Sequence, residues 1–112
     1  MSKKRPQATR LIPKLARFLG MSPVAMDWSG IDELMPLLEK LRADGAVVMI
    51  KWDGEHASGG AHGPYTALIT GQVLAGEFCR ADCSTIEEAL AEVVVTYASK
   101  RWGFVKQEPP KN

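Results

Sequence analysis

Residues 65–80, which read YTALITGQVLAGEFCR, decide the fold of this chain. The β-branched and aromatic residues of Tyr65 to Thr70 predict one strand, and Val73 to Arg80 predicts the next. Gly71 and Gln72 stand between them and are typical of a tight turn. Because so short a connection joins antiparallel neighbours, this stretch predicts a hairpin.

A further strand is predicted ahead of the hairpin. Residues 46–52 read AVVMIKW, and their nearly continuous apolar character predicts a central strand that is covered on both faces. Residues 53–64 contain four glycines and two histidines, so we expect a loop there. Together these segments predict a three-stranded antiparallel sheet.

Helices are predicted on both sides of the strands in the sequence. Apolar residues at helical spacing predict a helix from Ile31 to Ala43. Ser84 to Glu87 has the form of a capping box, in which the Ser84 hydroxyl accepts from the Glu87 N–H, and it predicts a helix that closes near Trp102. We therefore expect an α+β fold in the order α-α-β-β-β-α, with helices covering one face of the sheet.

The first helix of that order is short, basic and amphipathic. We expect its cap at Thr9 and its end at Gly20, with Pro13 in the first turn, where a missing N–H costs least. A chain of 112 residues is long enough for one hydrophobic core. The predicted organisation has three parts: a basic N-terminal arm at 1–22, an αβββα core domain at 23–104 and a polar tail at 105–112.

The net charge of +1 conceals a division between the arm and the rest of the chain. Residues 1–20 carry a charge of +6 without any acidic residue, whereas residues 21–112 carry a charge of −5. The basic residues are our candidate partner contacts: Lys3, Lys4, Arg5, Arg10, Lys14 and Arg17. Three interpretations stay open: nucleic-acid phosphates, an acidic protein surface, or a helix that packs on its own domain and leaves its charges in solvent.

Four residues have the composition of a zinc site, namely His56, His62, Cys79 and Cys83. Their spacing lacks the paired Cys-x2-Cys of known zinc sites, so we interpret them as solvated histidines and as thiols that form no disulfide. Ser58 lies between the histidines in a glycine-rich loop, which does not hold the geometry that nucleophilic catalysis needs. We expect no enzyme activity, no metal and no cofactor.

The α-β-β-β-α order of residues 31–102 resembles the topology of double-stranded-RNA-binding domains. That family holds phosphates with a lysine cluster at the start of its last helix. This sequence has Ser84-Thr85-Ile86-Glu87-Glu88 there. Carboxylates at that position would repel RNA, so the resemblance does not carry the family's binding mode to this chain.

The second half of the chain also resembles the β-β-α part of HicB-type antitoxins. The similarity covers Tyr65 to Ile69, the Ala75-Gly76-Glu77-Phe78 segment and the Thr85-Ile86-Glu87-Glu88-Ala89-Leu90 helix start. It implies a sheet that binds a small toxin or pairs with itself, and it implies no catalytic residue.

These observations favour a non-enzymatic protein-binding domain of the kind used as a bacterial or phage-borne accessory, inhibitor, immunity or antitoxin-type protein. The alternative is a nucleic-acid-binding protein that uses its basic N-terminal arm. No apolar run approaches the roughly 18 residues that cross a bilayer, so we expect a cytoplasmic protein without a membrane span. The third strand is an expected sheet edge, through which a second copy would pair to form a homodimer.

Overall fold

The computed structural model describes residues 5–55 and 63–105, and it has the predicted α+β fold and order of elements. Helix α1 spans Gln7–Phe18, α2 spans Met35–Ala43 and α3 spans Ile86–Tyr97. The strands are β1 at Val47–Trp52, β2 at Tyr65–Thr70 and β3 at Cys79–Cys83. Short helical turns precede α2 at Ile31–Leu34, precede β3 at Gln72–Leu74 and extend α3 through Ala98–Trp102.

The sheet is antiparallel throughout, with the strand order β1-β2-β3. The prediction that residues 46–52 form the central strand is therefore wrong, because β2 is central and β1 is an edge. Five of the six residues of β1 are exposed. An apolar run fits a strand covered on both faces, but here one face of β1 is open to solvent, and Ile50 and Trp52 on its other face are also exposed.

Strand β3 begins six residues later than the predicted Val73. Leu74 belongs to a 3-10 turn and is buried in the core. Ala75 and Gly76 have positive φ angles of 53° and 91°, and this left-handed backbone interrupts an extended chain. The connection after β2 is therefore a compact loop, and the predicted two-residue turn is wrong.

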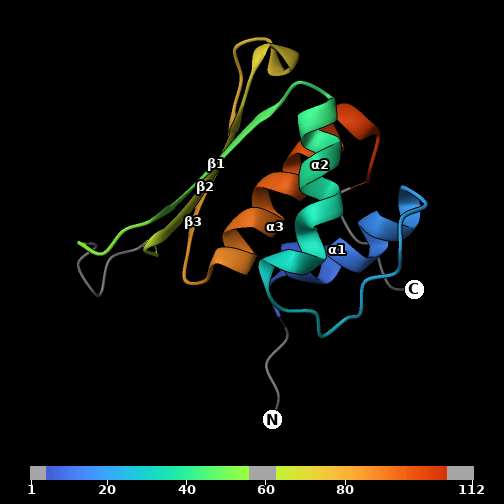
Figure 1. Ribbon diagram of the computed structural model, residues 1–112, viewed down its shortest axis with the longest axis horizontal. Coiled ribbons are helices and arrows are strands. Elements are labelled where there is room, and N and C mark those ends of the chain that lie inside the picture. Colours follow the sequence, from blue (N-terminus) through green and yellow to red (C-terminus); the bar gives the residue numbers. More distant parts are fainter. Residues whose placement is uncertain (1–4, 56–62, 106–112) are drawn as a thin grey trace, which may run out of the picture.

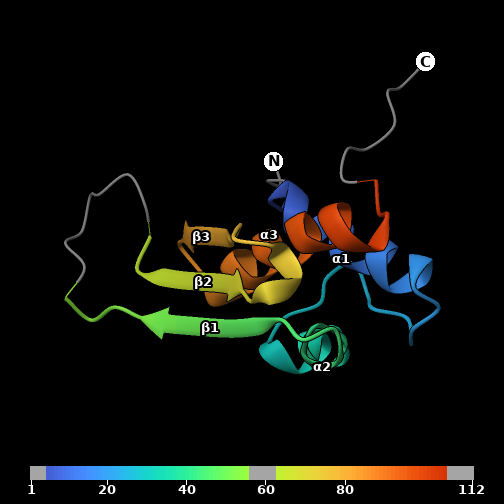
Figure 2. The same ribbon diagram turned by 90° about the horizontal axis from the view of Figure 1, so that it is seen from above.

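The molecule has a sheet layer and a helix layer (Figure 1). Helix α3 packs against β2 and β3, α2 packs against β1, and α1 lies against α3. Figure 2 shows the strands side by side, with α2 next to β1 and α1 on the far side of α3. In the part of the chain that the structure describes, no helix lies on the other face of the sheet.

The apolar side of α1 is part of the same hydrophobic core as β2 and α3. Leu11, Ile12 and Leu15 are almost fully buried in it. The sequence predicted that residues 1–22 form a separate arm, but the helix within this range is packed into the domain. This agrees with the third interpretation of the basic segment, in which the helix packs on its own domain.

Helix α1 begins two residues before the predicted cap, because Pro6 is the N-cap and Thr9 lies inside the first turn. This shift places Pro13 in the helix interior, where it has no N–H to donate to the Thr9 carbonyl. The buried indole Nε1 of Trp28 donates to that carbonyl instead, at 2.9 Å. The connector after α1 thus satisfies the carbonyl that Pro13 leaves without its helical partner.

The predicted capping box of α3 is wrong by one residue. Thr85 is the N-cap, and its hydroxyl accepts from the Glu88 N–H at 3.1 Å. Glu87 instead accepts from the N–H of Gly30 at 3.1 Å and so connects α3 to the segment before α2. Among the described helices, none has the length and apolar character that crossing a bilayer requires.

Candidate functional site

Alternate residues of the three strands point away from the helices. Ala67 and Ile69 are buried on the helix side of β2, so their neighbours Thr66, Leu68 and Thr70 point to the other side. Residues paired directly across an antiparallel sheet share a face, and the register extends this set onto β1 and β3. We call the set the open face: Val47, Met49, Lys51, Thr66, Leu68, Thr70, Arg80 and Asp82, with Phe78 at the entry to β3.

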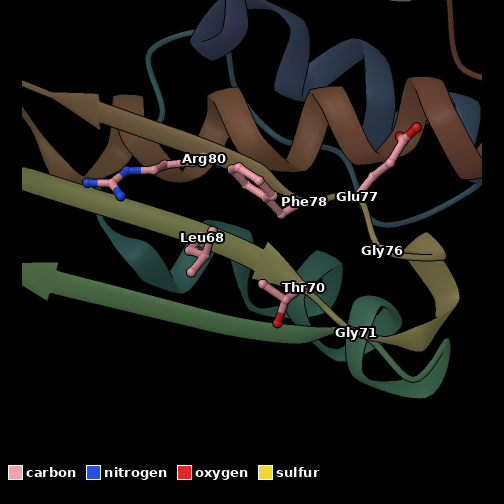
Figure 3. A pocket seen from close by; sticks show the side chains of 7 residues that line it. All are labelled: Leu68, Thr70, Gly71, Gly76, Glu77, Phe78 and Arg80. Atoms are coloured by element: carbon pink, nitrogen blue, oxygen red, sulfur yellow. The ribbon is translucent and has the colours of Figure 1, made fainter.

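One end of the open face is apolar. Val47 and Met49 are each 49% exposed, and Phe78 is 61% exposed. Leu68 lies between two shallow hollows, one lined with Thr70, Phe78 and Arg80, the other with Met49 and Arg80. In Figure 3 the side chains of Leu68, Thr70, Phe78 and Arg80 stand in front of the sheet, with the helices behind it. Single exposed apolar residues are ordinary, but neighbouring ones on one sheet face are typical of binding surfaces.

The other end of the open face is charged and ordered by hydrogen bonds. The Thr66 hydroxyl donates to Oδ1 of Asp82, and Arg80 donates to the same carboxylate from Nε and Nη2, each at 3.2 Å. The hydrogen bond to Asp82, and then its negative charge, raise the pKa of Arg80. Lys51 lies on the opposite edge, with its Nζ 3.9 Å from the Asp53 carboxylate.

The structure separates the six basic residues that the sequence proposed as partner contacts. Lys3 and Lys4 lie outside the described residues. The Arg5 guanidinium lies over the Trp28 ring, 5.0 Å from its centroid, and donates to the Met26 carbonyl at 2.9 Å. The Arg10 Nε donates to the Arg5 carbonyl at 2.9 Å.

The remaining two basic residues, Lys14 and Arg17, are exposed on α1. Because Arg5 and Arg10 make contacts within the domain, the basic segment is a weaker candidate for an external contact than its charge indicated.

The candidate zinc ligands are not brought together among the described residues. His56 and His62 lie outside them, as does Ser58. The predicted thiol form of Cys79 and Cys83 is confirmed, since neither forms a disulfide. In residues 5–55 and 63–105, no group of three or more His, Cys, Asp or Glu side chains is placed to hold a metal ion.

The surroundings of Cys83 make it a poor nucleophile. Burial raises the pKa of this thiol to about 11, and the negative charges of Glu88, Glu92 and Asp82 act in the same direction. The thiolate is the reactive form, so Cys83 is almost entirely protonated near neutral pH.

Sequence reasoning missed the open face because it placed residues 46–52 at the centre of the sheet. One signal was available. Lys51 interrupts the apolar run at the same side-chain phase as Val47 and Met49, which indicates that this side of the strand meets water at one end.

Comparisons of the chain with protein-family models, with curated proteins and with solved structures find no match. The resemblances to double-stranded-RNA-binding domains and to HicB-type antitoxins therefore stay predictions.

Proposed function

We propose that this protein is a protein-binding domain that contacts its partner with the open face of its sheet. The observation that carries the proposal is the cluster of exposed Val47, Met49 and Phe78 side chains around Leu68. Completing the burial of side chains of this size contributes on the order of 1 kcal/mol each. A role as an accessory, inhibitor, immunity or antitoxin-type protein fits this mode of action.

The face is suited to binding because it is already ordered. Hydrogen-bonded strands fix its backbone, and core residues such as Ala67 and Ile69 anchor it from behind. A rigid surface loses little conformational entropy on association. The apolar end favours an apolar partner surface, while Lys51, Arg80 and Asp82 at the other end favour one orientation of it.

Single substitutions on the face test the proposal. Wild-type protein and the Met49→Asp and Phe78→Asp variants would be purified under gentle conditions from the native host. We expect a stoichiometric protein partner with the wild type and at least about a tenfold loss of it with either variant, because a carboxylate would be buried unpaired in the interface.

Met26→Asp is the matched control, since Met26 is 56% exposed in the connector after α1 and lies off the sheet. It should retain the partner in full. Thermal melts of all the variants would verify that they are folded. A partner that persists through both face substitutions, or a wild-type chain that binds no protein, would contradict the proposal.

A further inference from the structure

We infer that the protein that fits the open face is a second copy of this chain. The two sheets pack face to face about a twofold axis that lies between them and is parallel to β2. This inference rests on the proposed function and names its partner. It is supported by the self-complementary arrangement of charged and apolar residues across the three strands.

The strand register divides the open face into rows that run across the sheet. Lys51, Thr66 and Asp82 are paired in one row. Met49, Leu68 and Arg80 are paired in the next row. Val47 and Thr70 are paired in the third, and Phe78, one residue before β3, lies at its end.

A twofold axis along β2 keeps each row opposite the same row of the other copy and exchanges the positions of β1 and β3. Lys51 of each copy then faces Asp82 of the other, so each Asp82 carboxylate, which already accepts from Thr66 and Arg80, gains an intermolecular ammonium. Val47 faces Phe78, and Leu68 meets its own counterpart on the axis. The Arg80 side chain of each copy lies over Met49 of the other copy, so that the Arg80 methylene groups contact the Met49 thioether.

The other in-plane axis, across the strands, is disfavoured by the same pattern. It would place the Lys51 ammonium over Val47 and the Asp82 carboxylate near Phe78, so both charges would lose water to apolar side chains and keep only their partners within the chain. Either axis keeps the strands of the two sheets within the roughly 30° that aligned sheets adopt when they pack about 10 Å apart. The charge pattern therefore decides between the two arrangements.

The size of the face sets the expected strength. Two strands of six residues and one of five span about 14 Å by 20 Å, so the contact is smaller than a standard specific interface. We therefore expect a reversible dimer that dissociates on dilution.

Sedimentation of the full chain over about a hundredfold range of concentration measures this equilibrium. The wild type should change from monomer to dimer as concentration rises. Lys51→Asp and Asp82→Lys should each weaken the dimer at least about tenfold, because each sets like charges opposite one another. An equimolar mixture of the two variants should regain the dimer, because the two introduced side chains then face one another with opposite charges and the remaining pair is native.

Arg17→Asp is the control, because Arg17 is exposed on α1 and away from the sheet, and it should dimerise like the wild type. A second measurement does not depend on the tolerance of Asp82 to substitution. Leu68→Cys places a thiol on the proposed axis and should form a cross-linked dimer with a short bifunctional thiol reagent, whereas Met26→Cys should not.

A wild-type chain that stays monomeric throughout, a variant mixture that does not regain the dimer, or an uncross-linked Leu68→Cys would each overturn the inference. The proposed function fails separately. If the wild type is monomeric but Phe78→Asp loses a different protein partner, the face binds proteins and the partner is not a second copy. If Phe78→Asp affects no association at all, both proposals fall.

Discussion

At Gly63 the chain passes so close to the end of β3 that no side chain fits. A Cβ atom at this position would overlap the backbone carbonyl of Cys83 and crowd the nitrogen of Ser84. Both neighbours are backbone and cannot rotate away. Gly63→Ala is therefore expected to destabilise the fold by about 2–4 kcal/mol, measured by chemical denaturation.

Gly54, at the other end of the same connection, supplies the control. A Cβ atom there meets nothing within 4 Å, and its φ angle lies outside the region that favours glycine. Gly54→Ala should leave the free energy of unfolding unchanged within about 0.5 kcal/mol. Equal effects of the two substitutions would contradict the close approach at Gly63.

The Trp28 indole donates to the Thr9 carbonyl, which Pro13 leaves without its helical donor. Trp28→Phe should cost about 1–3 kcal/mol, because the buried Thr9 carbonyl loses its donor. If Pro13 is first replaced by Ala, the new N–H can donate to that carbonyl, and the cost of Trp28→Phe should fall by about 1 kcal/mol. A double-mutant cycle on the free energy of unfolding measures this coupling, and strictly additive effects would argue against it.

The raised pKa of Cys83 predicts slow alkylation. Its pKa of about 11 lies above the reference value of 9.0, so at about pH 8 the thiolate fraction in the folded protein is roughly a hundredfold lower than in the denatured chain. Iodoacetamide labelling followed by mass spectrometry should show this rate deficit relative to the denatured chain. Because burial favours the protonated thiol, the contribution of Cys83 to stability is fully present below pH 9.0 and is lost as the pH rises towards about 11. Rapid labelling of folded Cys83 near neutral pH would contradict its protected setting.

Among the secondary-structure elements, the sequence predicted the number and the order correctly, because side-chain periodicity distinguishes helices from strands. It did not predict where β3 begins. Residues 73–78 contain β-forming side chains, yet the left-handed backbone at Ala75 and Gly76 turns the chain, and Leu74 is drawn into the core. Such a loop is decided by tertiary packing, which local propensity does not report.

The candidate site was harder to predict than the fold. A cluster of charges such as Lys3 to Arg17 is visible in a sequence, whereas the open face depends on which strand is central. The apolar run of β1 is compatible with a central strand and with an edge strand that exposes Val47 and Met49. Only the observed order β1-β2-β3 separates these two arrangements.

The start of α3 provides a test at the level of one element. Thr85→Ala should cost about 1 kcal/mol of unfolding free energy, because the Glu88 N–H loses the hydroxyl that caps it. Ser84→Ala, one residue earlier, should cost less than about 0.5 kcal/mol. The capping box read from the sequence predicts the reverse order, so thermal denaturation of the two variants decides between them.

For the whole molecule, the role of α1 decides how the division of charge is interpreted. A separate basic arm could be removed without loss of the domain. In the structure, α1 places Leu11, Ile12 and Leu15 in the common core, and losing each such side chain costs about 2–5 kcal/mol. Deleting residues 1–18 should therefore unfold the protein, since a domain of this kind is stable by only about 5–15 kcal/mol. A cooperative melt of the truncated chain, followed by circular dichroism, would show that the helix is dispensable.

Because deletion would remove the fold along with the charge, the nucleic-acid alternative needs charge reversal on an intact α1. Lys14→Glu combined with Arg17→Glu changes two exposed side chains and leaves the buried side of the helix untouched. If the basic segment binds phosphates, the wild type should shift a duplex in an electrophoretic assay at about 50 mM salt, and the double variant should lose most of that shift. Phe78→Asp, which alters only the open face, should leave it intact. A wild type that gives no shift at low salt, or a shift that survives the charge reversal, would contradict nucleic-acid binding by Lys14 and Arg17.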